Sequence, residues 1–173
     1  FTTSKNKTFG LLLHHVGKNN FKYFMSTIFY YANGWKQLSD TLVKKSYSSV
    51  FVLVDHNTKS HCLSYFDQHF SHTYALLTMD AGEANKHIGT CEHLWSSMSE
   101  QGADRNSLLI NLGGGVVTDL GGFVACTYKR GIDFINIPTS LLAMVDASVG
   151  GKTGVDFRGL KNQIGIIREP AFV

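Results

Sequence analysis

Cysteine, proline and long apolar runs are all scarce in this 173-residue sequence. The three cysteines, Cys62, Cys91 and Cys126, are odd in number and have no C-x-x-C spacing, which argues against a disulfide framework and favours a reducing compartment. The two prolines, Pro138 and Pro170, lie in no low-complexity linker, so we expect one domain. No stretch approaches the roughly 20 consecutive apolar residues of a membrane helix, so we expect no membrane partner.

An excess of charge of one sign is also missing. The formal net charge is +3, and no run of Lys and Arg is longer than two residues. This distribution predicts no nucleic-acid partner, although it suits a small anionic ligand held by a few well-placed cations. The first residues lack a basic segment followed by an unbroken apolar run, which is the pattern of a secretory signal, so we expect a cytoplasmic protein.

Apolar segments of two kinds alternate along most of the chain. Continuous β-branched or aliphatic runs predict strands at residues 49–54, 74–79, 107–112 and 133–137. Between and after them, helical patterns cover residues 58–70, 84–101, 116–128 and 139–146, and a glycine-broken loop follows at 148–153. Residues 1–35 are aromatic-rich and poorly periodic, so we leave this leading segment unassigned. Residues 36–173 are expected to form a mostly parallel α/β sheet with helices on both faces.

Three glycines separate the third strand from the helix that follows it. The run Leu112-Gly-Gly-Gly-Val116 lets backbone N–H groups approach an anion, and the helix start adds the positive end of its dipole. Asp55 and Thr139 follow other strands, and the carboxyl ends of parallel strands are where α/β sheets bind ligands. A tight turn explains the glycines equally well, and Asp119 in the first helical turn has an ordinary helix-start position.

A second glycine-rich segment spans Asp146 to Thr153 and ends in Gly-Lys-Thr. It is not a P-loop, because the Walker spacing requires glycine where Asp146 stands. The segment presents Lys152 beside Asp146, and Lys152 could bind a phosphate or carboxylate. The alternative is a surface loop with a solvated lysine.

Two weaker patterns remain. Glu83 and Lys86 precede the helix expected at 84–101, where a carboxylate has an ordinary stabilising role. His87 and Cys91 are four residues apart, but two candidate ligands do not make a zinc site, so we expect no metal within this chain and a core position for Cys91.

Considered together, these motifs match a known family. Residues 102–167 read GADRNSLLINLGGGVVTDLGGFVACTYKRGIDFINIPTSLLAMVDASVGGKTGVDFRGLKNQIGII and closely resemble the 3-dehydroquinate synthases. Gly82-Glu83-x-x-Lys86 and Asp55 with Asn57 match upstream motifs of that family. The resemblance implies an N-terminal NAD-binding domain of residues 36–173, and a C-terminal helical domain that is absent here.

The resemblance also implies an activity. The family converts 3-deoxy-arabino-heptulosonate 7-phosphate to 3-dehydroquinate and phosphate in the shikimate pathway, which supplies chorismate and the aromatic amino acids. NAD oxidises a ring hydroxyl transiently, and a bound zinc (or cobalt) ion polarises the reacting oxygens. The metal ligands belong to the C-terminal domain, so we expect this chain alone to be inactive.

The implied site residues divide by role. Those expected near the adenosine half of NAD are Asp55, Asn57, Glu83 and Lys86. Those expected at the pyrophosphate and ribose are Gly114, Gly115, Val116 and Asp119, and further cofactor contacts are Thr139, Ser140 and Lys161. Those expected at the junction of nicotinamide and substrate are Asp146, Lys152 and Asn162. Arg130 resembles a residue that reaches the active site of the partner subunit, which implies a homodimer.

The sequence departs from the family pattern at a few positions. Ser140 replaces a threonine and keeps the hydroxyl group, whereas Asp156 stands where asparagine is common and Phe157-Arg158 where His-Pro is frequent. The alternatives are another sugar-phosphate cyclase, an iron- or zinc-dependent alcohol dehydrogenase-like protein, and a stand-alone nucleotide-binding module. The alcohol dehydrogenase-like family lacks the Val-Asp-x-Ser-Val-Gly-Gly-Lys run.

Overall fold

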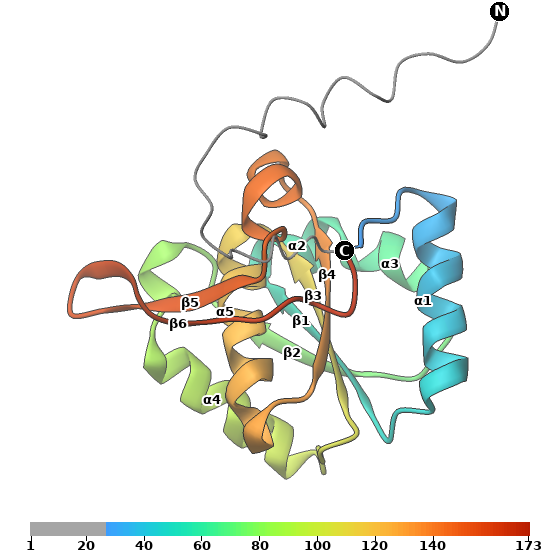
Figure 1. The fold of residues 1–173 in the computed structure, drawn as a ribbon, viewed down its shortest axis with the longest axis horizontal. Helices are drawn as coiled ribbons and strands as arrows, with labels where there is room; N and C mark the ends of the chain where they lie inside the picture. Colours follow the sequence, from blue (N-terminus) through green and yellow to red (C-terminus); the bar gives the residue numbers. More distant parts are fainter. Residues whose placement is uncertain (1–26) are drawn as a thin grey trace, which may run out of the picture.

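A four-stranded parallel sheet forms the centre of the molecule (Figure 1). The computed structural model describes residues 27–173. The sheet has the order β2-β1-β3-β4, and all three neighbouring pairs are parallel. Its strands are β1 Val50–Asp55, β2 Ala75–Met79, β3 Leu108–Gly113 and β4 Asp133–Pro138. The four strands and the parallel α/β class expected from the sequence are therefore confirmed.

Helices cover both faces of the sheet. Alternate residues of a strand point to opposite faces, so Phe51 and Leu53 of β1 pack with α4 and α5, whereas Val52 and Val54 pack with α1 and α3. Cys91 is fully buried in the first of these clusters, as predicted. The helices are α1 Ala32–Lys45, α2 His56–His61, α3 Leu63–His69, α4 Ile88–Glu100 and α5 Gly115–Thr127.

Three predicted helices have different limits in the structure. The segment 58–70 is two short helices, α2 and α3, and the helix expected at 84–101 begins only at Ile88. Residues Glu83–Asn85 form a separate 3-10 turn, because extended backbone at His87 (φ −141°, ψ 169°) interrupts the helix. The segment 139–146 contains a π-helical turn, Ala143–Ala147, in place of a regular helix.

Two elements have no counterpart in the sequence prediction. Helix α1 begins at Ala32, inside the segment left unassigned, while residues 1–26 of that segment lie outside the described part of the chain. An antiparallel hairpin of β5 Lys152–Phe157 and β6 Leu160–Ile167 replaces the end of the expected glycine loop. Its two turn residues, Arg158 and Gly159, have φ values of 50° and 80°, as a two-residue hairpin turn requires. Strand β5 packs on α5 through Val155.

The outer edge of β4 is covered by segments from the two ends of the described chain. The backbone N–H of Ala171 donates to the carbonyl oxygen of Phe134, and that of Asn136 donates to the carbonyl oxygen of Phe172. Val173 in turn exchanges hydrogen bonds with Thr27 and Phe29. The ring of Phe29 packs edge-on against Phe172, with centroids 5.7 Å apart. The sheet is thus extended past β4 by irregular backbone.

Candidate functional site

The candidate site lies between β1 and β3, the neighbouring strands from which the chain continues to opposite sides of the sheet. From β1 the chain adds β2 on one side, and it then crosses back to place β3 on the other side. In open parallel sheets, ligands bind outside the carboxyl ends of the two strands at such a switch point. Here those ends are Asp55 of β1 and Gly113 of β3, so the sequence-predicted residues at both strand ends meet at the expected edge.

Close packing explains the glycines at the end of β3. A Cβ atom on Gly113 would lie 2.6 Å from Cγ2 of Val117, so any side chain would push the start of α5 away from the sheet. Gly114 is the N-terminal cap of α5, and within residues 27–173 no side chain hydrogen-bonds to the free N–H groups at the start of this thirteen-residue helix. The start of α5 therefore offers unpaired donors at the switch point.

The loop after β4 forms a wall beside these glycines. The backbone N–H of Thr139 donates to the carbonyl oxygen of Gly113 at 3.0 Å. Cβ atoms added to Gly114 and Gly115 would lie 3.4 Å from Oγ of Ser140 and 3.3 Å from Cβ of Ala147, respectively. The structure thus brings the two glycines together with Thr139 and Ser140, as the sequence predicted. Val116 is half-buried at the same helix start.

Lys86 is the centre of a second group of predicted residues. Its side chain is only 4% exposed, and its Nζ lies 3.2 Å from Oδ2 of Asp119 and 3.3 Å from Oε1 of Glu83. The same Nζ donates to Oδ1 of Asn162 at 2.8 Å and lies 3.9 Å from Oδ1 of Asp156. Three carboxylates and one amide therefore converge on one buried ammonium group.

Opposing effects act on the ionisation of this cluster. Burial lowers the pKa of Lys86, but the neighbouring carboxylates of Asp119 and Glu83 outweigh burial, so the net pKa is raised. Burial raises the pKa of Asp119, and the nearby Lys86 offsets only part of that rise. Lys86 therefore stays charged at neutral pH, and its charge is what keeps the buried Asp119 carboxylate tolerable.

Two more lysines form ion pairs at the candidate site. Nζ of Lys161 lies 3.5 Å from Oε1 of Glu83, and Nζ of Lys152 lies 2.9 Å from Oδ1 of Asp146. Lys152 and Asp146 are 63% and 60% exposed, so their ion pair is open to solvent and can exchange partners. The predicted pairing of Lys152 with Asp146 is present in the structure.

Asp55 also stabilises local structure. Its Oδ1 accepts hydrogen bonds from the backbone N–H of Thr58 at 2.7 Å and from the Thr58 hydroxyl at 2.8 Å, which caps helix α2. Within residues 27–173, no hydrogen bond occupies its Oδ2, which leaves one oxygen for a ligand. Asn57, in the first turn of α2, is exposed.

Arg130 lies apart from the other predicted residues. Helix α5 starts at the candidate site, at the carboxyl ends of the strands, and runs back to their amino ends (Figure 1). Arg130 lies there, just before β4. Arg130 is exposed and has left-handed backbone, with a φ of 72°. Within one chain it therefore cannot contribute to the site at the carboxyl edge.

The arrangement differs from the resemblance in one respect. The sequence assigned Lys86 to the adenosine half of NAD and Asn162 to the junction of nicotinamide and substrate. These two side chains are in direct contact in the structure. Lys86 and Asn162 therefore cannot serve opposite halves of NAD, and one of them must contact a different part of the cofactor from the one that the resemblance implies. Asp156, which the sequence singled out only as a departure from the family, belongs to the same cluster.

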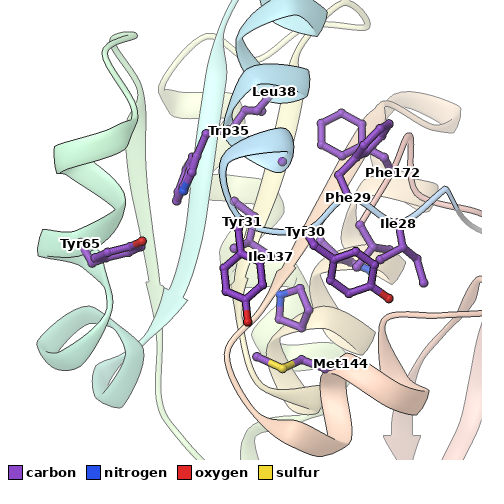
Figure 2. Close-up of a pocket in the computed structure, with 14 residues that line it drawn as sticks. Ile28, Phe29, Tyr30, Tyr31, Trp35, Leu38, Tyr65, Ile137, Met144 and Phe172 are labelled. Atoms are coloured by element: carbon purple, nitrogen blue, oxygen red, sulfur yellow. The ribbon is translucent and has the colours of Figure 1, made fainter. Parts of the chain in front are cut away.

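Two cavities lie near this edge. A polar one of about 380 Å³ lies beyond β1 and β2 and includes His56, whose Nδ1 is 3.3 Å from Oδ1 of Asp80. An apolar one of about 420 Å³ lies between α1 and the end of β4, and Figure 2 shows Tyr31, Trp35 and Tyr65 among its lining residues. Beside it, four large apolar side chains in and just before the π-helical turn are exposed: Leu141, Leu142, Met144 and Val145.

The part of the chain that the structure describes contains no metal-binding arrangement. Among residues 27–173, no three His, Cys, Asp or Glu side chains are grouped so that they could hold an ion. His69 stacks on the ring of Trp35, with centroids 5.1 Å apart, and His87 caps α4 through Nδ1. The same residues include no helix that is long and apolar enough to cross a membrane.

Comparison with known proteins identifies the family. The model of the 3-dehydroquinate synthase N-terminal family matches residues 76–173, which is more than half of the chain. This chain belongs to that family. The 3-dehydroquinate synthase of Parabacteroides distasonis is 48% identical over 138 residues, which cover 79% of this chain and 39% of that protein. The chain thus spans well under half the length of this relative.

Two solved structures share the fold. The 2-epi-5-epi-valiolone synthase of Streptomyces hygroscopicus subsp. jinggangensis 5008, solved with NAD+ and Zn2+ bound, is 30% identical with a TM-score of 0.65. The match covers 78% of this chain and 39% of that one. A 2-deoxy-scyllo-inosose synthase, complexed with carbaglucose-6-phosphate, NAD+ and Co2+, has a TM-score of 0.73 at 24% identity over 80% of this chain and 39% of its own. Both contain an α/β domain with the fold of this chain.

Proposed function

We propose that this chain is the NAD-binding part of a 3-dehydroquinate synthase. The observation that carries the proposal is the glycine cradle, by which we mean Gly114 and Gly115 at the uncapped start of α5. The cradle lies at the switch point beside Asp55 and beside the Lys86 cluster, which consists of Lys86 and the side chains around its Nζ. The 48% identity to the P. distasonis synthase supports the reaction, the conversion of 3-deoxy-arabino-heptulosonate 7-phosphate to 3-dehydroquinate and phosphate.

The residues at the switch point fit a dinucleotide. Gly114 and Gly115 leave no side chain where a pyrophosphate needs close approach, and a Cβ atom on either would make a tighter contact than usual with the loop of Ser140 and Ala147. The free N–H groups of α5 supply donors for phosphate oxygens. The free Oδ2 of Asp55, at the end of the neighbouring strand, would accept from a ribose hydroxyl, which favours NAD over NADP because a 2′-phosphate would meet a carboxylate.

The chain's own residues then position the substrate. NAD, when bound, supplies reversible hydride acceptance from a substrate hydroxyl. Lys152 is exposed, and the one ion-pair partner of its ammonium group within residues 27–173 is the exposed Asp146, so it can turn to an anionic group of the substrate. The Lys86 cluster fixes Asn162, and Lys161 stays beside Glu83 at the rim.

Two requirements of the reaction are not met at this site by the described residues of one chain. No group of residues within 27–173 fits the zinc or cobalt ion, so we derive no step through a metal. Arg130 is at the opposite edge of the sheet, and we propose that it completes the site of a second copy in a homodimer. The chain alone is then inactive, although it binds NAD.

The cradle can be tested by adding one methyl group. Gly114→Ala is expected to leave the fold intact, because its φ is −75° and the new Cβ makes only a tight contact with Ser140. We expect NAD affinity, measured by calorimetric titration, to fall about tenfold or more, which corresponds to roughly 1.4 kcal/mol of steric conflict. Gly34→Ala in α1, where the new Cβ makes ordinary contact with Phe29, is the control. Unchanged affinity in Gly114→Ala would remove the cradle from the cofactor site.

The reaction requires the natural protein of full length that carries this sequence. With NAD and zinc present, it should release phosphate from the heptulosonate phosphate, and Lys152→Ala should reduce that release by at least about a hundredfold. Lys36→Ala, another exposed lysine, should have no effect. A folded protein that binds NAD but releases no phosphate would contradict the substrate, and the substrates of other sugar-phosphate cyclases would be tested next.

A further inference from the structure

The hairpin of β5 and β6 contains an irregularity at the candidate site. Val155 pairs with Ile164 and Phe157 pairs with Leu160, so the single residue 156 of β5 faces residues 161–163 of β6. Strand β6 bulges at this point, and Asn162 has left-handed backbone with a φ of 53°. Lys161, which is predicted to contact the cofactor, and Asn162, which is predicted at the junction of nicotinamide and substrate, both lie in this bulge. Its shape therefore decides where their side chains lie.

Asp156 connects the bulge to the rest of the site. Its Oδ1 accepts a hydrogen bond from the backbone N–H of Asn162 at 2.8 Å. Its own backbone N–H donates to the carbonyl oxygen of Lys86, also at 2.8 Å, and a parallel bridge pairs it with His87. The Asp156 side chain is 19% exposed. One residue thus joins the bulge of β6 to the segment that carries Lys86.

Asp156 supplies an acceptor for the bulge. A bulged residue loses its partner in the ladder, and the backbone N–H of the exposed residue Asn162 donates to Asp156 in place of a ladder partner. A non-glycine residue with positive φ is also strained, even though asparagine tolerates it better than most. The Asp156 carboxylate supplies the missing acceptor at the strained residue. The side chain of that same residue, Asn162, then accepts from Lys86 at 2.8 Å.

We infer that Asp156 is a positioning residue, whose acceptor oxygen holds the bulge of β6 so that Asn162 stays on Lys86 and Lys161 stays at the rim for the cofactor. The inference rests on the proposed function for what the site binds, but the geometry that it explains does not. The decisive property is the oxygen acceptor, because Oδ1 of Asp156 is 3.9 Å from Nζ of Lys86 and contributes less there than Asp119 at 3.2 Å.

Two substitutions separate the acceptor from the charge. Asp156→Asn keeps an oxygen acceptor of the same reach and removes the charge, whereas Asp156→Ala removes both. Gln163→Ala is the control in the same bulge, because Gln163 is exposed and, among residues 27–173, its side chain bonds only to the carbonyl oxygen of Lys161. Amide hydrogen exchange of Asn162, followed by NMR, measures without any ligand whether its N–H stays hydrogen-bonded. Calorimetric titration measures the affinity for NAD and thus whether cofactor binding depends on the bulge.

We expect the wild type, Asp156→Asn and Gln163→Ala to protect the Asn162 amide and to bind NAD with affinities within about twofold of one another. In Asp156→Ala, both the protection of the Asn162 amide and the affinity for NAD should fall at least about tenfold, as expected for the loss of a hydrogen bond to a charged group.

Three outcomes decide the matter. Wild-type protection and wild-type affinity in Asp156→Ala overturn the inference. Lost affinity in Asp156→Asn with a protected amide also overturns it, and this variant decides alone if Asp156→Ala does not fold. A wild type that binds no NAD contradicts the proposed function, while the exchange of Asn162 still tests Asp156.

Discussion

Replacing Lys86 with methionine should remove NAD binding and lower the free energy of unfolding by about 3–5 kcal/mol at neutral pH, the range for breaking a buried ion pair on one side. Methionine keeps the length of the side chain, but it leaves Asp119, Glu83 and Asp156 without their shared cation. Urea unfolding measures the loss. Lys161→Met is the matched control: Lys161 pairs with Glu83 but is 72% exposed, so we expect less than about 1 kcal/mol. Equal stability of the two variants would contradict the central role of Lys86.

The deficit of Lys86→Met should depend on pH through Asp119. Burial already raises the pKa of Asp119 above its ordinary value, and removing Lys86 raises that pKa further. A carboxyl group whose pKa is raised in the folded state opposes folding when it is ionised and ceases to do so once it is protonated. The part of the deficit that comes from Asp119 should therefore grow as pH rises from the ordinary pKa, about 4, to the raised folded-state pKa, and stay constant above it. It should disappear below the ordinary pKa, where Asp119 is protonated in both states.

Gly121→Ala should be the most damaging small substitution outside the site. In a helix, alanine ordinarily stabilises relative to glycine by about 1 kcal/mol. A Cβ on Gly121 of α5 would overlap Oδ1 of Asn111 and lie 2.9 Å from Cδ2 of Leu53, both of which are fully buried. Asn111 cannot easily move, because its Nδ2 donates to Oδ1 of Asn136 at 2.9 Å. We expect a loss of about 2–3 kcal/mol from overpacking.

The same change in another helix should have the opposite sign. Gly34→Ala in α1 brings its Cβ no closer than 3.7 Å to Phe29, so we expect a gain of about 0.5–1 kcal/mol. Thermal unfolding of both variants measures the contrast. A stabilised Gly121→Ala would mean that α5 can move away from the sheet without cost, which would also weaken the argument for a fixed cradle.

Much of the sheet was predictable because burial on both faces makes its strands continuously apolar. Strands β1 and β3 are such runs, and β3 ends in glycine and β4 in proline, so four strands and their parallel arrangement could be predicted. Helix α1 was missed because it buries few side chains, among them Leu38 and Leu42. Their spacing of four residues was a helical signal, but polar residues surround it.

The hairpin was hidden by its glycines. Gly154 and Gly165 lie opposite each other, and Cβ atoms on them would contact backbone of the facing strand, so these glycines permit a close pair of strands where the sequence suggested a loop. The π-helical turn at Ala143–Ala147 likewise looked like a regular helix, since its apolar residues recur at helical intervals.

The membership of the candidate site was predicted better than its geometry. The motifs named Glu83, Lys86, Asp119 and Asn162, and the structure joins all four at one ammonium group. No sequence pattern could reveal that Lys86 is buried, because its burial depends on a hairpin from a distant part of the chain. The role of Asp156 was hidden for the same reason, since it depends on a bulge that only the pairing of β5 with β6 defines.

The covering of β4 has a consequence for the order of folding. An uncovered edge strand can pair with other molecules, and here Ala171 and Phe172 bond to Phe134 and Asn136 of β4, while Val173 bonds to Thr27 and Phe29 outside them. Val173 and its two partners are separated by nearly the whole length of the described chain, so their pairing closes the largest loop among the described residues. This outer layer over β4 is thus completed late, and until Ala171 and Phe172 are in place the outer groups of β4 are free to pair with a neighbouring molecule.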